Sequence, residues 1–308
     1  MSAPFDHFII IDWSARKAPS PAKPSRDAIW LADGSASAKG TNGRSAPIRL
    51  RYFRTRQAAI QHLQLRLKRL YKSGKRVLVG LDFSFGYPKG LAKALRLETE
   101  NAWQAIWAEL HRLIEDGPQN QNNRFQVAAE FNRRLKASLG PFWGVTSGQS
   151  GIFLGARKDF SFPVKVRKKI SLAEKRLVEQ RHSGLQSSWK LAYTGSVGSQ
   201  ALLGIPYIYQ LRFLSGDQFG LPQVWPFDTG LQYPETGQII FAEIWPSLAP
   251  RPRKDAIPDR EQVKVYLQWL RDEQLAGRLV QHFQGPADLS SEERQQVTQH
   301  EGWVLGIH

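Results

Sequence analysis

The stretch FIIIDWSAR, residues 8–16, runs from four apolar residues directly into an aspartate, an aromatic residue and a serine. The same order returns in VLVGLDFSFGYP, residues 77–88. A short apolar run bounded by polar residues is typical of a buried strand. Because an unpaired carboxylate is costly to bury, Asp12 and Asp82 are expected at strand ends, where the edge of a sheet opens into a cleft.

The segments around these two runs predict the order of the first elements. Three strands with antiparallel pairing are expected at residues 8–15, 27–34 and 48–55. A helix is expected over 57–74, because its apolar residues share one face and Gly74 can end it. A fourth strand follows at 76–83. This order opens the ribonuclease H-like fold, whereas a purely alternating βαβ fold would place a helix after the first strand.

The rest of the chain predicts a mainly helical and loop insertion at about 90–190, followed by a strand and further helices. Helices are expected from Thr99 and from about Arg124 to Leu139, with loop at 140–170. A short helix is expected within 195–212, a strand within 238–247, a helix from Asp259 to about Leu279, and a last helix opened by a capping box of Ser290 and Glu293. No clean linker appears. We therefore expect one α/β domain over 1–308, with a ribonuclease H-like mixed sheet flanked by helices.

The composition favours a folded, basic protein. Of the 308 residues, 41% are hydrophobic, which is enough for a substantial core. The 43 Lys and Arg against 27 Asp and Glu give a net charge of +16, and no acidic residue lies between Gly34 and Leu81. Such basic stretches favour a nucleic-acid partner. A second cluster, VKVRKKI at 164–170, supplies Lys165, Arg167, Lys168 and Lys169 as candidate phosphate contacts. A basic surface without a dedicated partner is the alternative.

Several function classes are disfavoured by what the sequence lacks. The chain has no cysteine, which excludes disulfides, Cys-ligated zinc and thiol catalysis. It shows neither a secretory signal pattern nor an apolar run long enough to span a membrane, so no membrane partner and a cytoplasmic location are expected. Phosphate-loop, H-E-x-x-H and G-x-S-x-G motifs are not met.

A third acid, Glu243, ends the apolar run of QIIFAEIWPS, residues 238–247. Carboxylates held together repel one another unless cations lie between them, and Mg²⁺ and Mn²⁺ prefer oxygen ligands. Two such ions about 4 Å apart can activate a water for phosphodiester cleavage, so two ions are the expected cofactor. Asp259 completes the predicted catalytic and metal-binding set, with Asp255 as its rival. An ordinary helix N-cap is the alternative role of Asp259.

Polar residues near the acids are candidate phosphate ligands. Ser14 and Ser84 each follow an aspartate by two residues, and hydrogen bonds to the turn backbone are their alternative role. GSVGSQ, residues 195–200, precedes a helix, so Ser196 and Gln200 are candidates for anion binding at its N-terminus. An ordinary helix start is the alternative there.

Four motifs also carry a family resemblance. The segments are IDWSA, VLVGLDFSFGYP, GSVGSQALLGIP and FAEIWPSL. Together they resemble a family of predicted ribonuclease H-like nucleases that is known as a domain of unknown function. The likeness spans about residues 8–270 and implies a ribonuclease H-like fold with a carboxylate metal site. This chain departs from the family pattern at Ser84, where proline is frequent, and at Trp245, where histidine is frequent.

The ending EGWVLGI, residues 301–307, places the resemblance closest to a subgroup often named for cobalamin or molybdopterin biosynthesis. Nothing in these residues indicates that chemistry. The leading hypothesis is a metal-dependent phosphodiesterase acting on nucleic acid. The alternatives are a catalytically inactive nucleic-acid-binding protein, and a small-molecule or nucleotide phosphotransferase or a protein associated with cofactor biosynthesis.

Overall fold

The structure is a computed structural model that describes residues 4–37, 46–97, 101–136, 139–166, 170–193, 196–250 and 257–308. Its first four strands are β1 (His7–Asp12), β2 (Ile29–Ser35), β3 (Arg49–Phe53) and β4 (Val77–Leu81), with helix α1 (Arg56–Lys72) between β3 and β4. The predicted order of three strands, a helix and a strand is confirmed. Both Asp runs form strands, and each acid lies at a strand end as expected, but β1 ends at Asp12 and β4 at Leu81, before the predicted bounds of 15 and 83.

These strands belong to one mixed sheet of six strands. Two further strands, β7 (Gln223–Trp225) and β8 (Ile239–Glu243), complete the order β3-β2-β1-β4-β8-β7. The pairs β1–β2 and β2–β3 are antiparallel, as predicted, and the pairs β1–β4, β4–β8 and β8–β7 are parallel. The carboxyl ends of β1, β4 and β8 therefore meet at one edge of the sheet.

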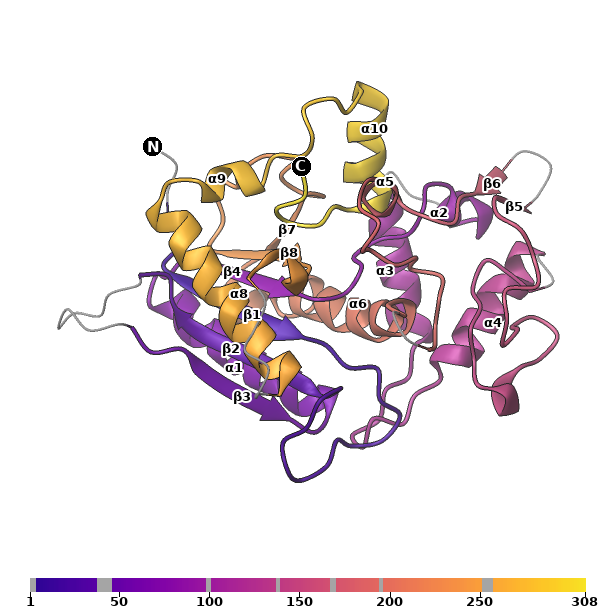
Figure 1. The fold of residues 1–308 in the computed structure, drawn as a ribbon, viewed down its shortest axis with the longest axis horizontal. Coiled ribbons are helices and arrows are strands. Elements are labelled where there is room, and N and C mark those ends of the chain that lie inside the picture. The colour runs from indigo at the N-terminus through magenta and orange to yellow at the C-terminus, as the bar shows by residue number, and fades with distance from the viewer. Residues whose placement is uncertain are drawn as a thin grey trace.

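Helices cover both faces of the sheet (Figure 1). Helix α8 (Pro258–Leu275) crosses one face and buries Val263, Tyr266, Leu267 and Leu270 against it. The other face packs on α1, on α3 (Ala102–Leu113) and on α6 (Gly198–Phe213). Because both faces are covered, the central strands are apolar on both sides, which is why their sequences read as continuous apolar runs rather than alternating ones.

The chain between β4 and β8 holds most of the remaining elements. They are α2 (Leu91–Ala94), α3, α4 (Arg124–Leu135), η1 (Ser147–Gln149), β5 (Val164–Val166), β6 (Ile170–Leu172), α5 (Leu177–Arg181), α6, α7 (Gly216–Phe219) and β7. The predicted insertion is thus mainly helix and loop, but β5 and β6 pair as a two-stranded ribbon. Strand β7 was not predicted, because three residues are too few to show a periodic pattern.

The chain closes with η2 (Pro246–Leu248), α8, α9 (Leu279–His282), α10 (Ser291–Gln296) and η3 (Val297–Glu301). The capping box of Ser290 and Glu293 is confirmed at α10. Helix α8 begins at Pro258, one residue before the expected start, and its N-cap is Ile257. The expected cap Thr99 lies outside the described residues. None of the helices in the described ranges is long and apolar enough to span a membrane.

Candidate functional site

Asp12 and Asp82 lie side by side at the carboxyl ends of the paired strands β1 and β4. Ile11 of β1 is in register with Leu81 of β4, and the Asp82 backbone N–H donates to the Ile11 carbonyl at 3.0 Å. The next residue on each strand is therefore an aspartate, and neighbouring strands are only about 5 Å apart. The two carboxylates occupy equivalent positions at the same edge of the sheet.

The alternation along the strands shows which face these two acids share. Ile10 and Gly80 precede the two aspartates by two residues, so they lie on the same face. A Cβ atom at Gly80 would stand 3.1 Å from Ile10 Cδ1 and 2.8 Å from Ile244 Cγ2. Ile10 and Ile244 belong to the core that packs on α8. Asp12 and Asp82 thus point toward the α8 side of the sheet.

The environment of this pair opposes ionisation. Burial raises the pKa of Asp12, and the charges of Asp82, Asp259 and Asp27 raise it further. Burial, together with the charges of Glu243 and Asp259, raises the pKa of Asp82 to about 7. Within the described ranges no Lys, Arg or His forms an ion pair with either side chain. The structure therefore concentrates negative charge here, and in the described part of the chain no cationic side chain pairs directly with these two acids.

Asp259 joins this group from the first turn of α8. Its Oδ2 accepts a hydrogen bond from the Asp27 backbone N–H at 2.5 Å. This bond attaches α8 to the segment before β2. Asp259 is therefore not the helix N-cap, which was the alternative role. The rival Asp255 lies outside the described residues.

Glu243 differs from the two aspartates. It is in register with Leu81, one residue before Asp82, so strand alternation directs its side chain to the opposite face. There it is nearly completely buried against Arg176, with Oε1 2.6 Å from Nη2 and Oε2 2.8 Å from Nη1. The Phe85 backbone N–H also donates to Oε2 at 2.9 Å. Glu243 is thus already bound by an internal cation.

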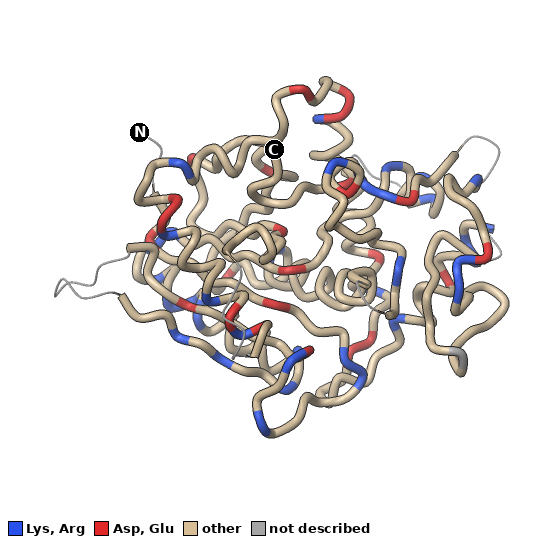
Figure 2. The backbone as a smooth tube through the Cα atoms, in the orientation of Figure 1, with Lys and Arg blue, Asp and Glu red and all other residues tan. Residues whose placement is uncertain are grey.

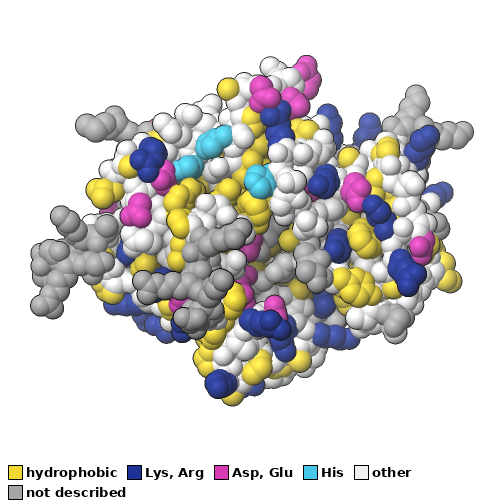
Figure 3. All heavy atoms as spheres, viewed as in Figure 1, with side chains coloured by type: hydrophobic (Ala, Val, Ile, Leu, Met, Phe, Trp, Pro, Cys, Tyr) yellow, Lys and Arg dark blue, Asp and Glu magenta, His cyan; other side chains and the backbone are white. Residues whose placement is uncertain are grey.

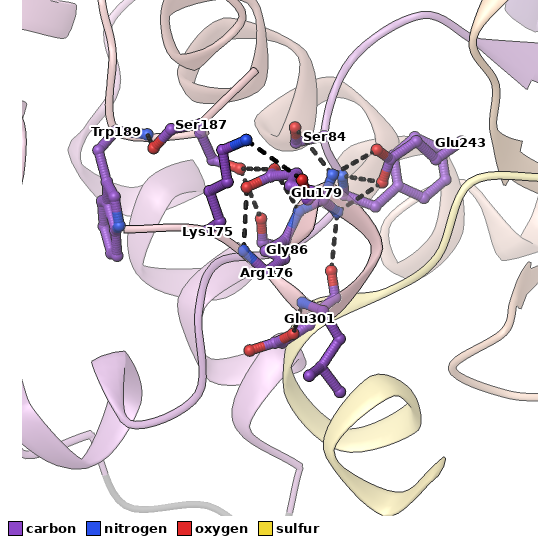
Figure 4. Close-up of polar contacts among 12 residues, drawn as sticks. Ser84, Gly86, Lys175, Arg176, Glu179, Ser187, Trp189, Glu243 and Glu301 are labelled. Carbon is purple, nitrogen blue, oxygen red and sulfur yellow. Dashed lines mark hydrogen bonds and ion pairs between the residues drawn. The ribbon is translucent and has the colours of Figure 1, made fainter. Parts of the chain in front are cut away.

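Arg176 is a residue whose role the sequence did not reveal (Figure 4). It is 1% exposed, and all five of its guanidinium N–H groups have acceptors. Besides the two bonds to Glu243, it donates to Glu179 Oε1 at 2.7 Å, to the Glu301 carbonyl at 2.8 Å and to Ser84 Oγ at 3.2 Å. Burial lowers the pKa of this arginine, but the charges of Glu243 and Glu179 raise it further than burial lowers it.

Two cavities open beside these groups. The larger, about 430 Å³, is lined by Asp12, Asp259, Arg16 and Arg124, among others. The smaller, about 220 Å³, is lined by Asp82, Ser84, Arg176 and Glu243. Ser196 and Gln200 line both cavities and lie between them. Figure 3 shows acidic side-chain atoms in a hollow near the middle of this face of the molecule.

The predicted phosphate ligands have structural partners. Ser14 Oγ donates to the Asp27 carbonyl at 2.9 Å, and Gln200 Nε2 donates to the Trp13 carbonyl at 2.8 Å. Ser84 accepts from Arg176, as described above. These bonds fix the loops after β1 and β4. Ser196 and Gln200 nevertheless remain at the cavity walls, at the N-terminal end of α6.

The basic residues are distributed differently from the prediction. Lys165 is exposed on β5 and lines neither cavity, while Arg167, Lys168 and Lys169 lie outside the described residues. Arg124, which was not predicted, lines the same cavity as Asp12. Its Nε donates to Ser199 Oγ at 2.9 Å. Burial, with the charge of Arg56, lowers its pKa to about 10, so it is still a cation at neutral pH.

No group of three or more His, Asp or Glu side chains in the described part of the chain is arranged to hold a metal ion. Asp12 and Asp82 each interact electrostatically with Asp259. Comparisons of this chain with protein-family models, with curated proteins and with solved structures found no match.

Proposed function

We propose that this protein is a divalent-cation-dependent phosphodiesterase that acts on nucleic acid and has a ribonuclease H-like fold. The order β3-β2-β1-β4, with α1 before β4, is the opening order of that fold and supports the assignment. The carboxyl ends of β1 and β4 supply the acids of the site, in agreement with the family resemblance of the same motifs.

The observation that carries the proposal is the pairing of Asp12 with Asp82. The two acids directly follow Ile11 and Leu81, the last pair in register on the adjacent parallel strands β1 and β4, and no basic side chain in the described ranges pairs with them. Burial raises the pKa of both, and the charges of neighbouring acids raise it further. A cation bound between them would remove this repulsion, so these residues suit a hard divalent ion.

The donor set also limits the kind of ion site. Since no three acids in the described part of the chain are arranged around one point, a bound ion would keep water or substrate oxygens in its other positions. Mg²⁺ is commonly held in this way, by one or two carboxylates together with substrate phosphates. When bound, such an ion lowers the pKa of a coordinated water and draws charge from a phosphate oxygen.

The neighbouring residues would bind and orient the substrate. Arg124 lies in the cavity of Asp12 and, within the described part of the chain, forms no ion pair with an acid, so its charge can contact a phosphate. The N-terminus of α6, next to Ser196 and Gln200, carries a partial positive charge that also favours an anion. The loop after β1 is held by Gln200, which keeps the Asp12 end of the strand in place.

The net charge of +16 suits a polyanionic substrate. Figure 2 shows basic residues along the β3 and α1 side of the molecule. The exposed ones in this part of the chain include Arg49, Arg51, Arg54, Arg69, Lys72 and Lys75. Binding is therefore expected to weaken steeply as salt concentration rises.

The test is cleavage of labelled single-stranded RNA, single-stranded DNA, duplexes and an RNA–DNA hybrid with Mg²⁺ or Mn²⁺. The wild type is compared with Asp12→Asn and Asp82→Asn, and Asp217→Asn, an exposed acid on α7, is the matched control. The proposal expects cleavage that needs the metal and is lost in both site variants but not in the control. Salt-dependent binding without any cleavage by the wild type would instead identify a nucleic-acid-binding protein.

A further inference from the structure

We infer that the proposed site takes a single divalent cation, at Asp12 and Asp82, and that the guanidinium of Arg176 is the permanent second positive charge at this edge of the sheet. The inference rests on the proposed function and concerns the composition of the same site. The sequence predicts two ions. We infer one, because in the fold Glu243 is already bound by an arginine.

The first step is the state of the Glu243 carboxylate. A carboxylate has about four lone-pair positions, and three of those on Glu243 are used by Arg176 and the Phe85 backbone N–H. A second ion would have to lie about 2.0–2.1 Å from one of these oxygens. The guanidinium stands 2.6 and 2.8 Å from the same two oxygens. A second cation would therefore meet a fixed charge of the same sign.

The second step is that Arg176 is held in place from several segments. Its guanidinium contacts α5 through Glu179, β8 through Glu243 and the C-terminal segment through the Glu301 carbonyl (Figure 4). The segment that carries it is also fixed, since the Arg176 backbone N–H donates to Glu179 Oε2 at 3.0 Å and the Leu177 N–H donates to Glu301 Oε2 at 2.7 Å. Moving the guanidinium away would break its hydrogen bonds to Glu179, Glu243 and the Glu301 carbonyl.

The third step is the contrast with Asp12 and Asp82. These acids have no basic partner in the described ranges and lie on the α8 side, whereas Glu243 and Glu179 share one guanidinium on the other side. With every N–H of Arg176 in use, the residue has none left for a substrate phosphate. Arg176 is thus a positioning residue: it occupies the Glu243 carboxylate and forms part of the wall of the cavity that Asp82 lines.

The test is Mn²⁺ binding to the full chain at pH 8, above the pKa of Asp82, without substrate. Calorimetry gives the number of ions, and electron paramagnetic resonance measures free Mn²⁺ independently. The wild type is expected to bind one Mn²⁺ per chain. Glu243→Gln keeps the shape of the side chain and should still bind one Mn²⁺, with a Kd within about threefold of the wild-type value. Asp12→Asn should lose the ion.

The outcomes separate this inference from the proposed function. Two Mn²⁺ per wild-type chain, or loss of binding in folded Glu243→Gln, would overturn the single-cation site and leave a metal-dependent phosphodiesterase possible. A wild-type chain that binds no Mn²⁺ would overturn both. Thermal unfolding without metal verifies that each variant is folded, so that a lost ion is not mistaken for a lost fold.

Discussion

Asp12 and Asp82 occupy equivalent positions at the ends of two adjacent parallel strands, and the Asp82 backbone N–H donates to the Ile11 carbonyl at 3.0 Å. This hydrogen bond joins the two strand ends, so the backbone holds the two acids at neighbouring positions. The backbone hydrogen bonds of β1 and β4 therefore maintain an electrostatic repulsion that the folded protein must offset by proton or cation binding.

The first prediction concerns the pH dependence of stability in the absence of metal. Asp82 has a folded-state pKa of about 7 against an ordinary value of 3.8. The folded protein then binds this proton more tightly than the unfolded chain, so stability falls as the pH rises from about 4 to 7. Asp82→Asn removes the contribution of Asp82 to this fall, while that of Asp12 remains, and should be more stable than the wild type at pH 8 by about 1–3 kcal/mol.

Urea unfolding at pH 5 and pH 8 in the presence of a chelator measures this effect. Asp217→Asn on the exposed face of α7 serves as the control and should follow the wild type at both pH values. A wild type whose stability does not fall between the two pH values would show that the charges at the strand ends are balanced in some other way.

Local sequence patterns were sufficient for the elements that build the sheet edge. The apolar runs before Asp12, Asp82 and Glu243 predicted three strands, and the 3.6-residue spacing of Ile60, Leu63 and Leu67 predicted α1. Each of these signals lies within a few residues. The acids were correctly expected at the ends of these strands, but the predicted bounds of 15 and 83 lay beyond the observed ends at Asp12 and Leu81, because aromatic and small residues continue the apolar pattern past each acid.

Local sequence patterns could not predict that Glu243 lies on the opposite face of the sheet from the two aspartates. Its face of the sheet depends on the register of β8 against β4, and a shift of one residue would reverse it. Arg176 was missed for a related reason. Its partner Glu243 is 67 residues away, and the local sequence places the arginine next to a basic cluster that is typical of an exposed surface.

The second prediction concerns Arg124 as a phosphate contact. Replacing it with alanine removes a positive charge from the cavity that Asp12 lines, so nucleic-acid binding should weaken several-fold and the salt dependence should fall by about one phosphate contact. Arg133 on the same helix is the matched control, because it is exposed and paired with Glu130. Arg133→Ala should change binding less.

Fluorescence anisotropy of a labelled oligonucleotide over a range of salt concentrations measures both quantities. Thermal unfolding accompanies the titration, since Arg124 also donates to Ser199. Equal affinities and equal salt slopes for the two variants would remove Arg124 from the proposed substrate path.

The third prediction concerns Arg56, which holds the loop after β1. Its guanidinium binds Asp116 through two nitrogens, at 2.6 and 2.7 Å, and donates to the carbonyls of Ser14 and Arg16. The arginine is completely buried, so Arg56→Met leaves Asp116 as a buried charge without its partner. This should lower the free energy of unfolding by about 3–5 kcal/mol.

An exposed pair provides the contrast for Arg56. Arg112 also contacts an acid, Glu109, at 2.8 Å, but its side chain is 64% exposed. Arg112→Met should therefore change stability by about 0–1 kcal/mol. Chemical denaturation at neutral pH measures the free energy of unfolding of both variants. Similar decreases in the two variants would mean that burial does not strengthen the Arg56–Asp116 pair.

The last prediction separates two interpretations of GSVGSQ. If the backbone at Gly198 cradled a phosphate, a methyl group there would impair anion binding and leave the folded protein largely intact. The structure favours packing instead, because a Cβ atom there would lie 2.4 Å from the Ser188 carbonyl oxygen and 2.7 Å from that of Lys190. Gly198→Ala should therefore destabilise the protein by about 1–3 kcal/mol even without ligand. Gly216, with no atom within 4 Å of its Cβ position, is the control. Thermal unfolding of both variants in phosphate-free buffer distinguishes the interpretations, since an unchanged Tm for Gly198→Ala would favour the anion cradle.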